Sequence, residues 1–266
     1  MGNKDVNLQI IPRFTRSVLH FSVLFVKVQD FKDYILFEND DYIVINKPPH
    51  VASLDERTAD RSLSILRMAK EYWDDAQLAH RLDKETSGVM AIAKNPAAYR
   101  HLAMQFEHRK VTKRYHAVVN GLHNLESIAV FLPIAISRDS TSVRIDREKG
   151  KPAETIFNTL RAYRKHTLVE CIPVTGRMHQ IRVHLMCIKA PIVCDKTYGG
   201  DPIFLSQIKK KFNLKQETDE WPLIQRVALH AHSLRFFLTD GEPVQIEAPY
   251  PKDFDVVVKQ LDKNSQ

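Results

Sequence analysis

One acidic residue, Asp83, stands among cations in a pattern that could support chemistry on a charged ligand. It follows His80 and Arg81, precedes Lys84, and lies just before the apolar run Val89–Ala93. A side chain at the start of a strand can face a ligand from the edge of a sheet. A carboxylate there can act as a nucleophile, stabilise positive charge or remove a proton. Taken alone, a surface ion pair with Arg81 or Lys84 is the simpler interpretation.

A second segment places a tyrosine beside cations. The stretch 113–121 alternates like a half-buried strand and ends in a turn-forming Asn-Gly pair. Tyr115 lies on this strand next to Lys113 and Arg114. An aromatic ring can stack on a nucleobase while neighbouring cations hold phosphates, and a tyrosine packed in the core is the alternative.

A third segment, 175–185, follows an alternating strand over 168–174 and leads into an amphipathic helix. The apolar side of this helix is formed by Met178, Ile181, Leu185 and Ile188. Its opposite side carries His179 and Arg182. Since His184 is five residues from His179, the two imidazoles lie on different faces, and no metal site is expected.

These three segments resemble the signatures of the RluA-type pseudouridine synthases, enzymes that rearrange uridine within RNA. The run HRLDKETSG at 80–88 is similar to HRLDxxTSG, KRYHAVVNG at 113–121 to KxYxAxVxG, and TGRMHQIRVHL at 175–185 to TGRxHQIRxHL. Two further stretches, 46–50 and 191–199, resemble NKPxG and PIxGDxxYG, with His50 and Cys194 standing where the family has glycine. A later Leu-His-Ala triplet at 229–231 also matches.

The resemblance implies an α+β fold, with a mixed, largely antiparallel sheet and a central catalytic cleft flanked by helices. It implies that Asp83 is the catalytic aspartate, that Arg182 is its ion-pair partner and that Tyr115 packs against the uracil. Arg177 is the second candidate for the ion pair; a phosphate contact or a solvated helix end are its other interpretations.

RNA contacts are implied as well, because the target base must leave its stack before a side chain can reach it. Arg81 matches the arginine that fills the vacated place in related enzymes, where a planar guanidinium can stack. The other residues expected at the RNA are His80, Lys113, Arg177 and His179. His80 is expected to be structural or to contact phosphate, without a role in proton transfer.

Motifs of several other chemistries do not occur in the sequence, among them GxGxxG, GxxxxGK[ST], GxSxG and HExxH. Uridine isomerisation involves no net redox change, so neither a cofactor nor a metal is expected. Two alternatives remain open. One is a non-catalytic RNA-binding or RNA-chaperone protein on the same fold. The other is a hydrolase that pairs Asp83 with Asp74 or Asp75.

Charge and composition agree with an RNA partner, either ribosomal RNA or tRNA. The 266 residues include 39 Lys and Arg against 32 Asp and Glu, a net charge of +7 that favours a polyanion. The three cysteines show no CxxC spacing, which fits free thiols in a reducing compartment. The apolar stretch 18–28 is too short to span a bilayer, so a cytoplasmic protein, monomeric by default, is expected.

The organisation expected along the chain is a leader or strand over 1–30 without an S4-like RNA-binding module, a catalytic domain over 31–258, and a disordered tail over 259–266. Strands are predicted at 34–37, 42–46 and 89–93. One helix is predicted after a cap at Ser62, and another after Asn95-Pro96. The charged stretch 205–222 is predicted to be a loop insertion.

Overall fold

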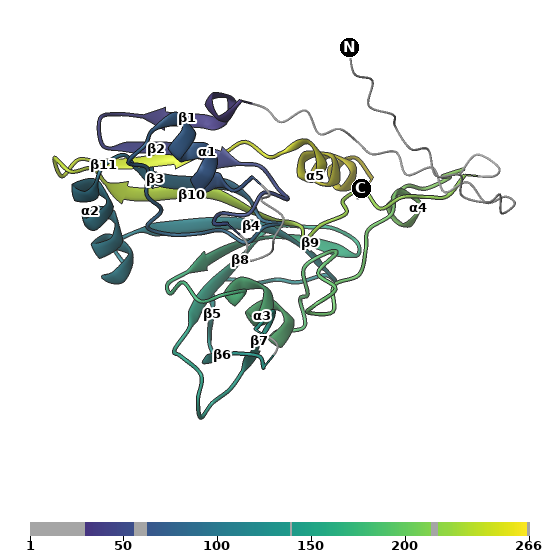
Figure 1. The fold of residues 1–266 in the computed structure, drawn as a ribbon. Coiled ribbons are helices and arrows are strands. Elements are labelled where there is room, and N and C mark those ends of the chain that lie inside the picture. Colours follow the sequence, from purple (N-terminus) through teal and green to yellow (C-terminus); the bar gives the residue numbers. More distant parts are fainter. Residues whose placement is uncertain (1–29, 56–62, 139, 214–217, 265–266) are drawn as a thin grey trace, which may run out of the picture.

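A computed structural model describes residues 30–55, 63–138, 140–213 and 218–264, and one large sheet forms its centre (Figure 1). In these residues the sheet has nine strands, in the order β1-β2-β3-β10-β4-β9-β8-β5, with β11 paired to β10. The strands are β1 (Ile35–Glu38), β2 (Tyr42–Lys47), β3 (Ser87–Ala93), β4 (Thr112–Asn120), β5 (Ile128–Phe131), β8 (Glu154–Ala162), β9 (His166–Pro173), β10 (Leu229–Phe237) and β11 (Pro243–Glu247). A separate hairpin consists of β6 (Ile134–Ile136) and β7 (Val143–Ile145).

Helices complete an α+β architecture. They are the 3₁₀ turn η1 (Phe31–Tyr34), α1 (Ile65–Tyr72), α2 (Pro96–Glu107), α3 (Gln180–Cys187), α4 (Leu205–Ile208) and α5 (Lys252–Asn264). Of the strand pairs in the described sheet, β3 with β10 is parallel and the others are antiparallel. The predicted fold class, a mixed and largely antiparallel sheet with helices, is therefore confirmed. In the described residues, no helix is long and apolar enough to cross a membrane.

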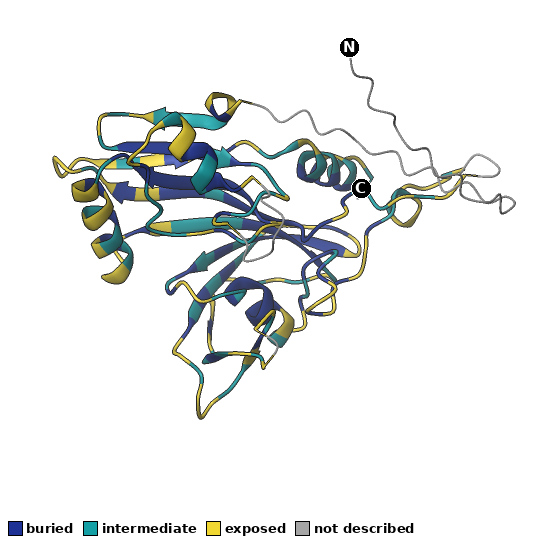
Figure 2. Cartoon of the chain, viewed as in Figure 1, coloured by how far each residue is buried: buried dark blue, intermediate teal, exposed yellow. Residues whose placement is uncertain are grey.

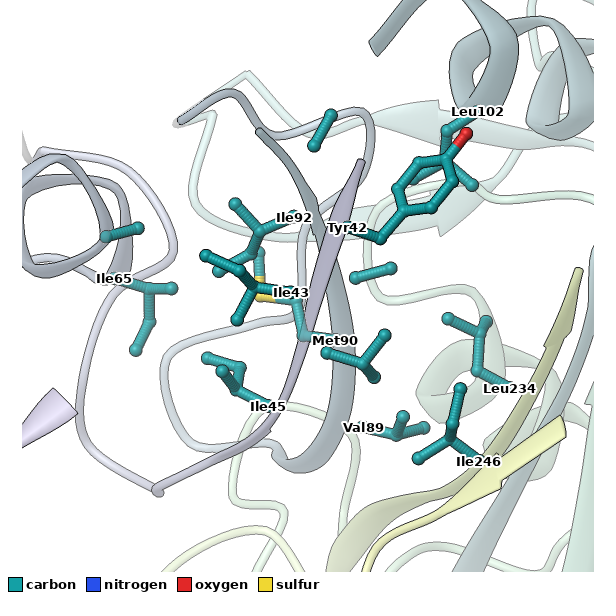
Figure 3. Close-up of a cluster of buried hydrophobic side chains, with 14 of the residues drawn as sticks. Tyr42, Ile43, Ile45, Ile65, Val89, Met90, Ile92, Leu102, Leu234 and Ile246 are labelled. Atoms are coloured by element: carbon teal, nitrogen blue, oxygen red, sulfur yellow. The ribbon is translucent and has the colours of Figure 1, made fainter. Parts of the chain in front are cut away.

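Two hydrophobic clusters divide the sheet into halves. In the first, α1 and α2 pack against β2, β3 and β10 (Figure 3). In the second, α3 and α5 pack against β4, β8 and β9. Figure 2 shows the buried strands running through both halves. Tyr115 on β4 packs against both clusters, so it marks the junction between them.

Within the first half, the parallel pair β3 and β10 makes an unusually close backbone approach. Ser87 lies opposite His230, and Gly88 lies opposite Ala231. Gly88 has φ +113°, and a Cβ atom there would lie 2.2 Å from the Ala231 carbonyl oxygen. Only glycine fits this position. Two segments that share the family resemblance are thus brought together, which fixes the start of β3 and the loop before it.

Local signals explain the helix starts. Asn95 caps α2 by accepting a hydrogen bond from the Ala98 amide at 2.8 Å, with Pro96 at the first helical position, as predicted. For α1 the cap is Ser64, which accepts from the Arg67 amide at 3.2 Å. The predicted cap, Ser62, lies outside the described residues.

Three predictions of local structure were wrong. Residues 259–264 are not a disordered tail but the end of α5, where Leu261 is buried against the sheet. The stretch 205–222 contains the short helix α4 within the predicted loop. The helix predicted to be amphipathic is instead buried on both sides, since Arg182 and His184 are buried and Val183 packs against the β6–β7 hairpin. A hairpin brought in from elsewhere in the chain cannot be inferred from the period of one helix.

Candidate active site

A cleft lies where the two halves of the sheet meet, and it collects most of the predicted site residues. Its volume is about 80 Å³. Its lining includes Arg81, Asp83, Tyr115, Arg177, His179 and Arg182. Asp83 comes from the loop before β3, Tyr115 from β4, and Arg182 from α3. Asp83 and Arg182, which are far apart in the sequence, thus line the same cleft.

The Asp83 carboxylate is accessible within this cleft. Its side chain is 28% exposed, and an imidazole and a guanidinium of the described residues lie within 4 Å of Oδ2. These are His179 Nε2 at 3.8 Å and Arg182 Nη1 at 3.9 Å. Both distances exceed hydrogen-bond length. The Arg182 guanidinium therefore lies near the carboxylate, whose oxygens remain open to a ligand.

The loop that carries Asp83, residues 80–86, is held by its neighbours on one side. Ser53 donates a hydrogen bond to the Leu82 carbonyl at 2.7 Å and accepts one from the Leu82 amide at 3.0 Å. His80 accepts from the Ala91 amide through Nε2 at 3.0 Å. Burial lowers the pKa of His80 to about 3, so this imidazole is neutral. Its bond to β3 supports the structural role among the two that the sequence left open.

Two buried basic side chains, Lys47 and Arg226, donate hydrogen bonds to backbone carbonyls of the same loop. Lys47 donates to the Lys84 carbonyl at 3.3 Å, and burial lowers the Lys47 pKa to about 7. Arg226 donates to the Glu85 carbonyl at 2.9 Å and to Ser87 Oγ at 3.2 Å. A bidentate pair with Asp253 on α5, at 2.7 and 3.0 Å, fixes its guanidinium. Sequence reasoning assigned no role to Arg226, whose only local signal was its position just before the Leu-His-Ala triplet.

Arg182 has a closer carboxylate partner than Asp83. Its Nε and Nη2 atoms donate to the two oxygens of Asp195 at 2.7 and 2.8 Å. Asp195 is fully buried, so its charge is balanced inside the protein. The expected ion pair with Asp83 is thus a longer contact, and Asp195 orients the guanidinium that makes it. Asp195 falls in the segment resembling PIxGDxxYG but received no role from the sequence.

Tyr198 contacts Arg182 of α3 and His179 before it, and it also received no role from the sequence. Its ring lies 5.0 Å from the Arg182 guanidinium carbon, and its hydroxyl accepts from the Val143 amide at 2.9 Å. The hydroxyl contacts His179 Nδ1 at 3.0 Å. If the hydroxyl proton is donated to Nδ1, Nε2 carries the imidazole proton and faces Asp83. Burial lowers the pKa of His179, which favours this neutral form.

Gln180 explains how the turn before α3 presents its cations. It is buried and accepts from Thr175 Oγ1 at 2.7 Å and from the Arg177 amide at 3.0 Å. His179 then adopts a left-handed backbone with φ +48°. Such strain in a residue other than glycine is typical of functional sites. The backbone conformation aims the His179 ring at Asp83.

Three predicted site residues form the walls and rim of the cleft. Tyr115 forms part of a wall, and burial and the Asp83 charge raise the pKa of its hydroxyl, which stays protonated. Arg81 and Arg177 are exposed at the rim. Lys113 lies outside this cleft, in an adjoining groove, and donates to the Thr175 carbonyl at 3.1 Å.

The two departures from the family pattern keep the backbone that glycine would adopt. His50 has φ +65° and Cys194 has φ +63°. Both lie in the left-handed region, which costs a residue other than glycine about 1 to 2 kcal/mol. The substitutions therefore change the side chains while leaving the course of the chain that glycine favours.

Replacement of Arg182 tests how much stability the ion pair between Arg182 and Asp195 contributes. Arg182→Met is expected to lower the free energy of unfolding by about 3 to 5 kcal/mol, because it leaves a buried carboxylate unpaired. The double variant Arg182→Met/Asp195→Leu is expected to recover most of that stability and to stay inactive. Urea unfolding and pseudouridine formation should be measured on both. Activity in the double variant would show that Arg182 acts only through folding.

The fold and the cleft define a pseudouridine synthase, an isomerase that acts on RNA. A family model described as RNA pseudouridylate synthase matches residues 41–186. This range holds Asp83, Tyr115 and Arg182. The chain belongs to the RNA pseudouridylate synthase family.

Relatives and solved structures agree with this assignment. The "Ribosomal large subunit pseudouridine synthase C" of Buchnera aphidicola is 38% identical, over 87% of this chain and 71% of its own length. The protein of the same name from Escherichia coli K12 is 35% identical, over 84% of this chain and 68% of its own. The structure called Human RNA Pseudouridylate Synthase Domain Containing 4 superposes with a TM-score of 0.65 and 25% identity, covering 87% of this chain and 94% of its own.

Proposed function

We propose that this enzyme isomerises a uridine of large-subunit ribosomal RNA to pseudouridine and that Asp83 is its catalytic carboxylate. The observation that carries the proposal is the Asp83 side chain, open to the cleft and faced by Arg182 and His179 at 3.9 and 3.8 Å. The names of the bacterial relatives support ribosomal RNA over tRNA as the substrate.

The reaction moves the uracil without gaining or losing atoms. The bond from ribose C1′ to N1 breaks, the base turns, and a bond from C1′ to C5 forms. The proton leaves C5, and N1 ends protonated. Asp83 can add to an electrophilic carbon, stabilise positive charge at C1′ or remove a proton from the sugar, and each of these roles needs an accessible carboxylate. Arg182, which is bound to Asp195, faces that carboxylate at 3.9 Å.

The uridine must leave its stack to reach Asp83, at a cost of a few kcal/mol. Tyr115 is placed to pack against the extruded uracil from the wall of the cleft. Arg81 is exposed at the rim, two residues from Asp83, where its planar guanidinium can occupy the vacated place in the RNA. Arg177 and His179 lie beside the same opening.

The geometry weakens the hydrolase alternative. Asp74 and Asp75 are exposed on the turn after α1 and do not line the cleft, so neither pairs with Asp83. The other carboxylate near the site, Asp195, is buried and bound by Arg182. A second, activating carboxylate is therefore missing from the described part of the cleft. The non-catalytic alternative predicts RNA binding without turnover.

Mapping of pseudouridine at single-nucleotide resolution tests the proposal. Total RNA from cells with and without the gene should differ at one or a few uridines of the large-subunit RNA. The purified protein should restore the same positions on RNA from the deletion strain. Modified sites confined to tRNA would contradict the substrate assignment. Unchanged RNA, together with tight RNA binding in vitro, would favour the non-catalytic alternative.

A further inference from the structure

A second hollow, here called the flanking groove, opens directly beside the catalytic cleft. It has a volume of about 630 Å³ and shares Arg81 and the turn residues Thr175, Gly176 and Arg177 with the cleft. Its far side is the end of α2, with Phe106, Glu107 and Arg109. The two hollows therefore form one continuous path over the Asp83 loop.

The floor of the flanking groove is apolar and accessible. It is lined by Leu54, Leu78, Ala79, Phe106 and Val174. Leu54 is 42% exposed, so this part of the floor is open to solvent. The Phe106 ring is held in place by stacking on His80, with centroids 4.6 Å apart. A rigid apolar floor of this kind suits the face of an unpaired nucleobase.

Cations dominate the rim. Arg81, Arg109, Lys113 and Arg177 line the groove against a single acid, Glu107. Within the described residues, none of these four cations has a carboxylate within ion-pair distance. Burial and the nearby Arg109 charge lower the pKa of Lys113 to about 8. Two like charges held together without a counter-ion favour the binding of an anion.

We propose that the flanking groove is a second nucleotide site, which binds the unpaired nucleotide adjoining the uridine in the catalytic cleft. Its base lies on the floor formed by Leu54 and Phe106, and its phosphate lies between Arg109 and Lys113. This inference rests on the proposed function, because it assumes that the target uridine occupies the Asp83 cleft. The site makes a single-stranded stretch of at least two nucleotides part of the substrate.

Salt dependence of binding tests the phosphate contacts without requiring turnover. A fluorescein-labelled oligouridylate of nine nucleotides should be titrated by anisotropy between about 50 and 200 mM KCl. For single strands, each lost phosphate contact lowers the slope of log Kd against log salt by about 0.7. Arg109→Gln should lower it by about that amount, and Arg109→Gln/Lys113→Gln by about 1.4. An unchanged slope in the double variant overturns the proposal.

Arg100→Gln is the matched control, because Arg100 is exposed on the same helix and does not line the groove. Its slope should equal that of the wild type; an equal fall would mean that only net charge matters and would also overturn the proposal. Phe106→Leu keeps an apolar floor without the ring. It should weaken binding about fivefold with the slope unchanged. Thermal unfolding of each variant shows that it remains folded.

Turnover on large-subunit RNA separates this inference from the proposed function. Arg109→Gln should raise KM and leave kcat within about twofold, since Arg109 touches only the flanking nucleotide. If the wild type modifies no ribosomal RNA but the slopes fall as expected, the groove stands and the substrate assignment fails. If the wild type is active and the slopes do not change, the groove alone is refuted.

Discussion

Asp83→Asn is expected to abolish pseudouridine formation while leaving RNA binding within a few fold. The amide has the same shape as the carboxylate but cannot act as a nucleophile or a base, and loss of such a group costs about a thousandfold or more in turnover. The described structure shows no hydrogen bond that the carboxylate oxygens would lose, so the fold should be unaffected. Single-turnover assays on large-subunit RNA, together with a binding titration, measure both effects.

Asp74→Asn is the matched control for this variant. Asp74 is an exposed aspartate on the turn after α1, outside the cleft, and its replacement should leave turnover unchanged. Turnover retained by Asp83→Asn would disprove the catalytic assignment. Loss of binding together with turnover would place Asp83 in RNA recognition.

Three buried histidines are expected to destabilise the protein by about 4 kcal/mol between pH 7.5 and pH 5.5. Burial lowers the pKa of His80 and His116 to about 3 and that of His230 to about 4, and neighbouring histidines add to the shift at His116. Burial also lowers the pKa of His166, His179, His184 and His232, which add to this loss. In the unfolded chain each titrates near 6.5.

The sign follows from proton uptake. Below pH 6.5 these three side chains are protonated in the unfolded state but stay neutral in the folded state. The free energy of unfolding therefore decreases as the pH is lowered. The loss continues until the pH approaches the folded pKa values near 3 to 4. Each histidine contributes a slope of about 1.4 kcal/mol per pH unit. Urea unfolding at several pH values gives the free energy of unfolding as a function of pH. The slope of that curve gives the number of protons taken up on unfolding.

Two variants check the source of the effect. His116→Gln should reduce the stability at pH 7.5, because its bond to the Tyr250 hydroxyl is lost, and should flatten the pH dependence by about one proton. His108→Gln should change neither property, since His108 is exposed at the end of α2. Equal slopes in the wild type and in His116→Gln would refute the assignment to the buried ring.

Local structure was predictable wherever a short stretch carries its own signal. The cap and proline at Asn95-Pro96 start α2 as predicted, and the alternation over 113–119 became β4. The end of α5 was missed although its signal was present. Phe254, Val257, Val258 and Leu261 follow a helical spacing that should have overruled the expectation of a disordered tail.

The site was predictable as a set of residues but not as a set of contacts. The order of the motifs indicated Asp83, Tyr115 and Arg182 as site residues, and the structure places all three at one cleft. The strongest partner of Arg182, however, is Asp195. The Arg226 support of the Asp83 loop spans 141 positions to Glu85. Neither contact follows from spacing, because it depends on how distant strands pair.

The sequence by itself therefore determined the class of enzyme, the chemical groups available to it and most of the elements that carry them, because these depend on neighbouring residues. Only the tertiary structure decided which charges meet, which stay open to a ligand and where the flanking groove lies. Burial and ion pairing arise from long-range packing, as where Gly88 lets β3 approach Ala231 of β10. That contact fixes the loop on which Asp83 faces the cleft.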